Sequence, residues 1–530
     1  MLFNSYAFLF GFLPLAVAGA FLLGRVHHRA GAAWLALASL VFYAVWDVRF
    51  LLLLLASIAL NFCAGLAIAR ARAAGQRARA RRTLILAIVA DLAVLATFKY
   101  ASFLLTNLAA VVHLPVHAAA AAHSIAESIV LPLGISFFTF TQMAFLVDAY
   151  RGEVRESDPL SYLLFVSYFP HLIAGPLLHH RQMMPQFARP STFRPDLQNI
   201  AVGSGIFVLG LAKKLLLADN LALVADPVFH AAQAHEAVPV AGAWSGALAY
   251  TLQLYFDFSG YSDMAIGLSL LFNVRLPLNF DSPLRAASVI DFWRRWHMTL
   301  SAWLRHYLYI PLGGNRLGPR RRYVNLMITM LLGGLWHGAG WTFVLWGGLH
   351  GVYLMINHAW RELCVRQGWG DGGVAGRVLA RGATFLAVVV AFVFFRADSV
   401  QGAWTILCGM LDGAPSWAAA GAVPDAAVRD AAALNPFRGD DAALGITRLI
   451  VPAALLLAWF CPNVHQMFAA YRPTWEDQEG VPTPAPAGRG TLARALRWTP
   501  RPVFALVQGG LLAVCVFFLM RVSEFLYFRF

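Results

Sequence analysis

Charged side chains are scarce in this sequence. Asp, Glu, Lys and Arg make up 13% of its 530 residues, about half of the share usual in soluble globular proteins. Hydrophobic residues make up 59%, and the mean hydropathy is +0.62. A water-soluble fold of this length needs a charged surface around its core, and this chain has too few charges to form one. The composition therefore excludes a soluble globular protein and predicts that lipid surrounds most of the molecule.

Cysteines and metal-ligand patterns are also few. The five cysteines lie far apart and follow neither a disulfide nor a zinc spacing, which favours a role as small core residues. The pairs His27-His28 and His179-His180 have no carboxylate-rich or cysteine-rich surroundings. We interpret them as loop residues and not as metal ligands. We therefore expect neither a bound metal nor a bound cofactor.

A cleavable signal peptide is not indicated at the start of the chain. Residues Met1 to Leu23 have no basic n-region, and Asn4 and Pro14 interrupt their apolar pattern. Further hydrophobic stretches follow at once, without a cleavage site that leads into a soluble domain. We interpret this segment as a retained helix.

Long apolar stretches are present along the whole chain. A membrane-spanning helix needs ~20 mostly apolar residues. The candidate stretches are 5–24, 33–46 with 50–69, 83–105, 129–147, 160–178, 198–218, 243–272, 324–335 with 341–358, 380–396, 448–470 and 503–522. Several are short, interrupted or charged, and such pieces occur at membrane depth where they line a cavity or are buried in protein. We therefore predict an all-α polytopic membrane protein with roughly 11–12 transmembrane helices and additional re-entrant or interfacial helices around a central cavity.

The net charge of +14 follows from where the arginines lie. In a soluble protein it would suggest a nucleic-acid partner, but here the positive-inside rule accounts for it. We therefore expect a lipid membrane, and no nucleic acid, as a partner. The runs assigned to the cytoplasmic face are Arg70, Arg72, Arg77, Arg79, Arg81 and Arg82, and Arg320-Arg321-Arg322. If Arg25 and Arg29 are cytoplasmic too, residues 46–49 turn on the opposite side and the N-terminus lies outside.

Two segments differ from the membrane body in composition. Residues 412–447 are rich in Ala, Gly, Pro and Asp, and residues 472–501 contain five prolines with charges of both signs. Both patterns indicate exposed loops, and neither segment is large enough for a confident soluble domain. We therefore predict a single membrane domain over residues 1–530 with these two exposed loops.

Polar residues inside apolar stretches are costly and mark function by default, and they concentrate in residues 251–358. Residues 250–263 read YTLQLYFDFSGYSD, so that Asp257 and Asp263 lie within a hydrophobic segment. Asp257 and Tyr261 have the i,i+4 spacing that places two side chains on one helix face. We expect this segment to lie near a functional site.

A basic and aromatic segment follows at residues 291–316, DFWRRWHMTLSAWLRHYLYIPLGGNR. Its arginines and tryptophans suit an interfacial or re-entrant helix with guanidinium groups at the level of the lipid headgroups. Asp291 and Arg295 have the i,i+4 spacing of an ion pair, and His297 follows them. Pro311 and the glycines after it are expected to end this helix.

His337 lies deep in the next apolar stretch. It is fifteen residues beyond Arg322, which at about 1.5 Å per residue is ~22 Å, or roughly two-thirds of a ~30 Å hydrocarbon core. Glycines on both sides of Trp336 and His337 allow a close approach of the backbone to a ligand or another helix. A buried neutral imidazole is the usual general base for a hydroxyl group.

Each of these features also has a purely structural explanation. A hydrogen bond between helices explains His337, an interfacial position beside Trp296 explains His297, and topology alone explains the arginines. The residues by themselves predict an arginine-rimmed cavity in the membrane with two histidines, and they leave its reaction open.

The order of the motifs resembles the membrane-bound O-acyltransferase superfamily, and most of all its alginate O-acetylation branch. The similarity runs over nearly the whole chain. The matching segments are Leu2–Ser5, Phe169–Pro176, Tyr255–Asp263, Phe292–His297, Tyr309–Arg316, Gly334–Ala339 and Ser523–Phe528. Each motif alone is weak, whereas all of them in this order are specific.

This resemblance implies roles for individual residues. His337 matches the catalytic histidine of the family, and His297 matches a second functional histidine. Asp257 and Asn315 lie in motifs associated with the active-site region. Trp336 precedes the catalytic position and joins the candidate substrate-binding residues.

The resemblance also implies acetyl-CoA in the cytosol as the acyl donor. Guanidinium groups at the cytosolic rim would bind its phosphates, and His337 would deprotonate an acceptor hydroxyl or thiol or take the acetyl group itself. The sequence leaves both routes open. The candidate phosphate-binding residues are Arg294, Arg295, Arg316 and Arg320 to Arg322.

The expected setting is the inner membrane of a bacterium. A periplasmic partner acetyltransferase of the SGNH type would place the acetyl groups on an exported polysaccharide such as alginate. Related branches acylate teichoic acids, lipids or proteins, so the acceptor polymer stays open. Two alternatives are a transporter for a polysaccharide or lipid intermediate, which broken helices would also suit, and a non-catalytic scaffold of a secretion complex.

Overall fold

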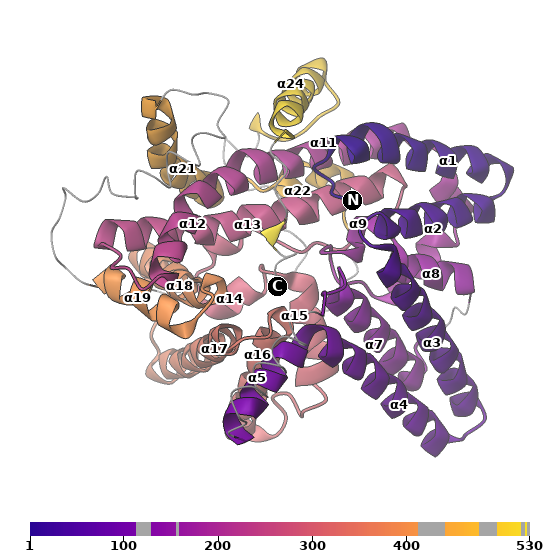
Figure 1. Ribbon diagram of the computed structural model, residues 1–530, viewed down its shortest axis with the longest axis horizontal. Coiled ribbons are helices and arrows are strands. Elements are labelled where there is room, and N and C mark those ends of the chain that lie inside the picture. The colour runs from indigo at the N-terminus through magenta and orange to yellow at the C-terminus, as the bar shows by residue number, and fades with distance from the viewer. Residues whose placement is uncertain are drawn as a thin grey trace.

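The computed structural model describes residues 1–112, 129–154, 158–370, 372–411, 440–475, 495–520 and 525–526. Over these ranges the chain is almost entirely helical (Figure 1), and the β pairing within them is confined to an isolated bridge between Pro277 and Trp475. The structure therefore confirms the all-α prediction.

Most of the first helices lie at the right of Figure 1, while the last of them, α5 (Ala101–Val112), lies at the bottom centre. The helices of this part are α1 (Leu13–Val26), α2 (His28–Ala44), α3 (Val48–Ala73), α4 (Arg77–Leu95) and α5 (Ala101–Val112), with π-helical turns η1 (Ala7–Phe12) and η2 (Ala96–Tyr100). The break predicted at residues 46–49 lies between α2 and α3. Asp47 causes it, because its carboxylate accepts the N–H of Arg49 at 2.9 Å and caps α3.

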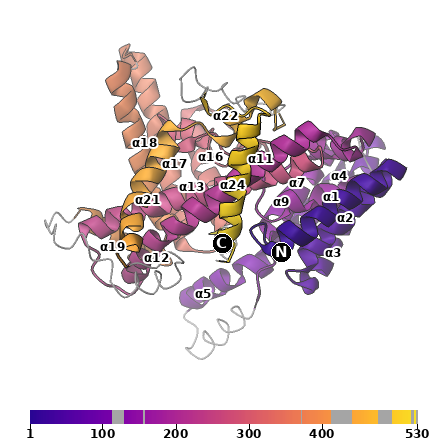
Figure 2. The same cartoon turned by 90° about the horizontal axis from the view of Figure 1, so that it is seen from above.

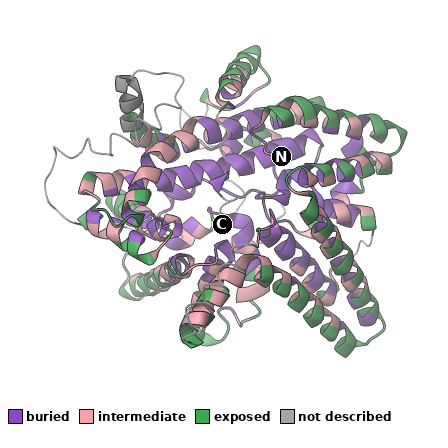
Figure 3. Cartoon of the chain, viewed as in Figure 1, coloured by how far each residue is buried: buried purple, intermediate pink, exposed green. Residues whose placement is uncertain are grey.

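The middle of the chain forms the centre of the molecule. Its helices are α7 (Ile135–Arg151), α8 (Pro159–Ser167), α9 (Phe169–Leu172), α10 (His180–Phe187), η3 (Pro190–Phe193), α11 (Leu197–Ala212), η4 (Lys213–Ala218), α12 (Asp219–Gln233) and α13 (Val240–Leu271). Every residue of α13 from Ala249 to Leu271 is buried, which Figure 3 shows as an unbroken purple helix. The polar residues that the sequence places around Asp257 therefore lie inside protein and not against lipid.

Small residues allow α11 and α13 to lie in direct backbone contact. A Cβ atom on Gly203 would lie 2.6 Å from the carbonyl oxygen of Gly267, and one on Gly210 would lie 2.6 Å from that of Gly260. Side chains at these four positions would force the helices apart, and glycine, which has no side chain, allows the contact.

The last part of the chain packs against α13 and α11. Its helices are η5 (Pro283–Arg285), α14 (Val289–Trp293), α15 (Met298–Leu304), η6 (Arg305–Tyr309), α16 (Gly318–His337), α17 (Trp341–Gln367), α18 (Gly373–Arg396), α19 (Val400–Leu411), α21 (Asp440–Phe460), α22 (Val464–Met467), η8 (Ala469–Tyr471) and α24 (Pro502–Phe518). α16 and α17 form an antiparallel pair, and α24 lies against α11, as Figure 2 shows from above.

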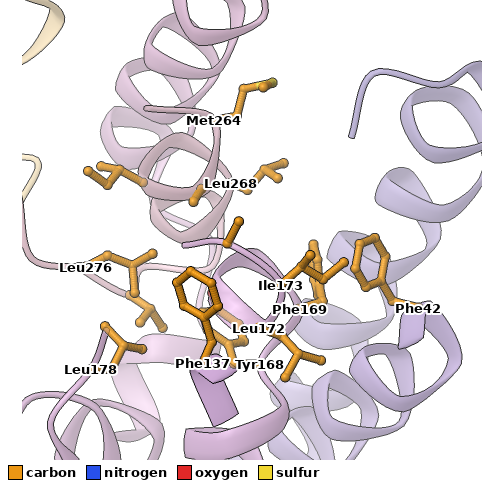
Figure 4. Close-up of a cluster of buried hydrophobic side chains, with 14 of the residues drawn as sticks. Phe42, Phe137, Tyr168, Phe169, Leu172, Ile173, Leu178, Met264, Leu268 and Leu276 are labelled. Carbon is orange, nitrogen blue, oxygen red and sulfur yellow. The ribbon is translucent and has the colours of Figure 1, made fainter. Parts of the chain in front are cut away.

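Aromatic side chains hold the first helices against the centre. Figure 4 shows Phe42 from α2 beside Phe169 from α9, with Leu268 from α13 nearby. The rings of Phe42 and Phe169 have centroids 5.4 Å apart, and all three side chains are buried. The burial of such large apolar surfaces is the main stabilising contribution here.

Several helices are long and apolar enough to cross a membrane. Five are found in the described residues, at Ala7–Val26, Val48–Ala73, Arg77–Ala109, Leu197–Gln233 and Gly373–Arg396. The outer helices expose much of their surface (green in Figure 3), as lipid contact requires. The chain is a multi-pass membrane protein, and the predicted total of roughly 11–12 spans stays a prediction.

The predicted stretch 160–178 does not form one helix. It is divided into α8, the short α9 and an extended piece. Tyr168 leaves the helical conformation at ψ 110°, and the hydroxyl of Ser39 on α2 accepts the N–H of Phe169 at 3.2 Å. The segment is largely buried, and a partner from another helix replaces the lost helical hydrogen bond.

The two predicted exposed loops are each corrected at an end. Helix α21 begins at Asp440, so the last residues of the 412–447 loop are helical, while 412–439 lie outside the described residues. In the 472–501 loop, Thr474 and Trp498 are buried, and Trp498 stacks on Phe468 at 5.1 Å between centroids. The prolines and charges of this segment indicated an exposed loop. The indole of Trp498 is nevertheless buried, because it packs against Phe468, which lies before the segment.

Candidate active site

His337 is the last residue of α16. The helix ends because Gly338 is extended, with φ −157° and ψ 149°, and the imidazole is buried. Its ring centroid lies 5.0 Å from that of Trp346, 5.2 Å from that of Phe395 and 4.9 Å from that of Trp336. Aromatic rings thus enclose the predicted catalytic histidine and keep water from it.

His297 lies against the same site. Its ring centroid is 6.1 Å from that of His337 and 4.8 Å from that of Phe258 on α13. The residue is fully buried and has a left-handed backbone conformation, with φ 42° and ψ 54°. The structure therefore brings together the two histidines that the sequence singled out.

The single helix predicted over 291–316 is wrong. The chain breaks between α14 and α15, and His297 lies at the break. Asn279 satisfies the released backbone groups. Its carbonyl oxygen accepts the N–H of Met298 at 3.0 Å, and its side-chain oxygen accepts the N–H and the hydroxyl of Thr299. Such a partner comes from another part of the chain, which is why the local pattern indicated a continuous helix. The segment does end after Ile310, as predicted.

A cavity of about 660 Å³ is lined by the residue next to His297 and by residues earlier in α16, while the two imidazoles themselves lie outside its lining. The wall of this cavity includes Met298, the residue after His297. It also includes Thr329 and Met330, which lie two turns of α16 before His337. The polar side chains that line it are Arg294, Ser301, Arg305, His306, Tyr309, Asn315, Thr329 and His358. Two of the predicted donor-binding residues, Arg294 and Asn315, thus face one cavity together with basic neighbours that sequence reasoning had not placed there.

Other predicted site residues lie elsewhere. Arg295 pairs with Asp291 at 2.8 Å, as predicted, and also lies 3.8 Å from Asp281. Arg316 and the run Arg320 to Arg322 are outside the cavity lining, near the start of α16.

Asp257 is also separate from the cavity, because it belongs to a buried ion pair. Its carboxylate lies 2.7 Å from the ammonium of Lys214 and accepts the N–H of Leu526 at 3.0 Å. Lys214 contacts Asp219 at 2.8 Å as well. A buried charge needs a partner of this kind, so the geometry gives Asp257 a structural position between α13, η4 and the end of the chain.

Trp336 lines a second, smaller hollow. Its volume is about 60 Å³. Lys99, Ser136 and Trp46 are among its lining residues, together with residues 131–135. The residue before His337 therefore faces this hollow.

Sequence reasoning missed several residues of the site. His350 on α17 is fully buried, accepts the indole N–H of Trp293 at 3.3 Å, and has its ring centroid 4.9 Å from that of Trp346. Lys99 donates hydrogen bonds to the carbonyl oxygens at the end of α16. A lone lysine within the apolar stretch 83–105 was the signal that could have found it.

The assignment of His179 and His180 to a loop is corrected for His180, while His179 is the extended residue before the helix. His180 begins α10 and is buried. Both imidazoles face Asp148 on α7, at 3.9 Å and 3.4 Å, and the hydroxyl of Tyr307 donates to the same carboxylate at 2.8 Å. These groups fasten η6, whose neighbouring side chains line the cavity.

The structure thus brings two buried histidines together among aromatic rings, close in the chain to residues that line a cavity with arginines in its wall. The model of the membrane-bound O-acyltransferase family matches residues 81–392. The chain belongs to this family, and it is an acyltransferase.

Several curated relatives are similar over most of their length. The peptidoglycan O-acetyltransferase of Helicobacter pylori is 42% identical over 438 residues, which cover 78% of this chain and 80% of the relative. A probable alginate O-acetylase of Azotobacter vinelandii is 44% identical over 413 residues, covering 77% and 78%. A teichoic acid D-alanyltransferase of Streptococcus thermophilus is 29% identical over 246 residues, covering 44% and 58%.

Proposed function

We propose that this acyltransferase moves acetyl groups from acetyl-CoA in the cytosol across the bacterial inner membrane, for the O-acetylation of an exported polysaccharide. A periplasmic acetyltransferase of the SGNH type would complete the transfer. The observation that carries the proposal is the His297–His337 pair, whose centroids lie 6.1 Å apart and whose chain neighbours Met298 and Trp336 line two openings of different size.

The positions of the openings support a transfer across the membrane. α16 begins beside Arg320 to Arg322 and ends at His337, so it leads from the side with the basic run toward the opposite face. Arg72, at the end of α3, donates to the carbonyl oxygen of Tyr150 on α7, and Arg151 donates to that of His306 in the cavity wall at 3.2 Å. Trp46, before the other end of α3, lines the small hollow. By the positive-inside rule, the large cavity faces the cytosol and the small hollow faces the periplasm.

The large cavity suits an anionic thioester. Its volume of about 660 Å³ is within the usual range for small-molecule sites. Arg294, Arg305 and His306 supply positive charge and N–H donors at its wall, and guanidinium groups bind phosphates well. The apolar part of the wall, including Met298, Leu326 and Met330, suits the pantetheine arm.

The chemistry requires one base near the thioester carbonyl. His337 would take the proton of an acceptor hydroxyl as its oxygen attacks the acetyl carbon. The carbon–sulfur bond then breaks, and the CoA thiolate leaves and takes the proton from the imidazolium. His297 lies close enough to orient the reacting groups. Exclusion of water by the surrounding rings favours transfer over hydrolysis.

The relatives support the choice of acceptor. Their names refer to O-acetylation of peptidoglycan and alginate and to D-alanylation of teichoic acid, and all three acceptors are polymers. An exported polysaccharide is therefore the proposed final acceptor of this chain's acetyl groups.

The test is the acetyl-ester content of the exported polysaccharide. A strain lacking this gene would be complemented with wild type, His337→Ala and, as a control, His28→Ala, at matched levels in the membrane. We expect wild type and His28→Ala to restore the esters and His337→Ala to leave them absent. Restoration by His337→Ala would instead support a scaffold, and polymer flux without any acyl donor in proteoliposomes would support a transporter.

A further inference from the structure

The last turn of α16 meets two side chains from η2, far away in the sequence. The ammonium of Lys99 donates to the carbonyl oxygen of Trp336 at 2.6 Å and to that of His337 at 2.9 Å. The hydroxyl of Tyr100 donates to the carbonyl oxygen of Leu335 at 2.8 Å. Three consecutive carbonyl groups at the end of the helix are thus held by two consecutive residues.

These contacts use all of the N–H groups of Lys99. Its third donation is to the hydroxyl of Ser136 on α7, at 3.3 Å. Lys99 lines the small hollow, but it has no remaining N–H for a substrate there. The ammonium also lies at a helix C-terminus, where a positive charge complements the partial negative charge of the carbonyl groups. The side chain is therefore built to hold the protein, not to bind a ligand.

The end of α16 needs such support. The last four carbonyl groups of a helix have no partner within the helix, and at membrane depth water is not available to satisfy them. Since His337 is the final residue and Gly338 is already extended, a frayed last turn would move the imidazole itself.

We propose that Lys99, together with Tyr100, is a positioning residue for acyl transfer, which holds the last turn of α16 so that the imidazole of His337 faces the donor. This inference rests on the proposed function, because it takes His337 as the general base. Lys99 acts through the backbone of His337 and does not touch the donor, since it lies outside the lining of the large cavity.

The test is the turnover of acetyl-CoA by purified full-length protein in lipid nanodiscs, with a short oligosaccharide supplied as the acetyl acceptor and with kcat and KM measured separately. Lys99→Met keeps most of the side-chain volume and removes its N–H groups. We expect kcat to fall about 100-fold, the effect of a small misplacement of a reacting group, and KM for acetyl-CoA to stay within about twofold. Lys99→Arg keeps a charged donor and is expected to recover about tenfold of this loss.

Two further variants make the result decisive. Thr97→Val is the matched control, because Thr97 is exposed on the same turn and donates to the carbonyl of Ala93 in its own helix at 2.9 Å; we expect wild-type kcat. Tyr100→Phe keeps the ring and removes one hydrogen bond, so that kcat is expected to fall about fivefold with KM unchanged. If Lys99→Met fails to fold, Tyr100→Phe serves as the test of the proposal.

Wild-type kcat in Lys99→Met or, where that variant is unfolded, in Tyr100→Phe overturns the proposal. So does a rise in KM in place of the loss in kcat, because it would place Lys99 on the donor's route. Absence of turnover in the wild type is a different outcome, which overturns the proposed function and with it the base that Lys99 would position.

Discussion

The imidazole rings of His297 and His337 lie with their centroids 6.1 Å apart, although one residue interrupts a pair of short helices and the other ends a long one. Aromatic rings from α13, α16, α17 and α18 surround the two imidazoles. The candidate site thus has two parts: a catalytic centre at the two histidines, and the arginine-lined cavity, which is the proposed approach of the donor. Mutations in the two parts should have different effects.

Removal of the second imidazole should affect catalysis more than donor binding. For His297→Ala we expect kcat for acetyl-CoA turnover to fall by roughly 10²–10⁴, with little change in KM, because the ring lies beside His337 and outside the cavity lining. His28→Ala serves as the control in the same assay. A large rise in KM with kcat intact would show that His297 belongs to the approach.

The cavity arginines should affect donor binding. Arg294→Gln removes a guanidinium from the cavity wall, so we expect KM for acetyl-CoA to rise about tenfold or more while kcat changes little. The difference should shrink at high salt, since the interaction is electrostatic. Arg316→Gln is the matched comparison, because Arg316 is exposed and lies outside the lining. An equal effect of both substitutions would contradict a specific role for Arg294.

The buried pair of Asp257 and Lys214 should matter for stability. Replacing Asp257 with Ala leaves the ammonium of Lys214 with Asp219 alone, and loss of one partner of a buried pair costs about 3–5 kcal/mol. We expect a lower unfolding temperature in detergent, measured by intrinsic fluorescence. The double variant Asp257→Asn with Lys214→Met should recover part of the loss. If Asp257→Ala unfolds like wild type but loses turnover, Asp257 has a direct role in the reaction.

The contact of α11 and α13 should not tolerate side chains. Gly203→Leu would place its Cβ 2.6 Å from the carbonyl oxygen of Gly267, and overpacking of this kind costs about 1–3 kcal/mol or more. We expect reduced amounts of folded protein in the membrane. Gly509→Leu on α24 is the control, because no atom lies within 4 Å of its added Cβ. Equal yields of both variants would show that the helices are able to move apart.

Much of the site was predictable because its signals are local. An imidazole or carboxylate inside an apolar stretch is costly wherever the chain folds, so His337, His297 and Asp257 were conspicuous in the sequence. The role of Asp257 was not, because Lys214 reaches it from another helix. The same reason explains the break at His297, where the loop at Asn279 supplies the hydrogen bonds that a continuous helix would have made.

The sequence by itself determined that lipid surrounds this protein, that the chain is helical, and that two histidines and a set of arginines lie where lipid would not accept them. These properties follow from the free energy of transferring each side chain and each backbone group between water and hydrocarbon, which is a property of short segments. Only the tertiary structure decided which arginines face the cavity, that Asp257 is part of an ion pair, and that Lys99 and Tyr100 hold the end of α16. Those outcomes depend on contacts between distant segments, and the packing of the helices alone selects them.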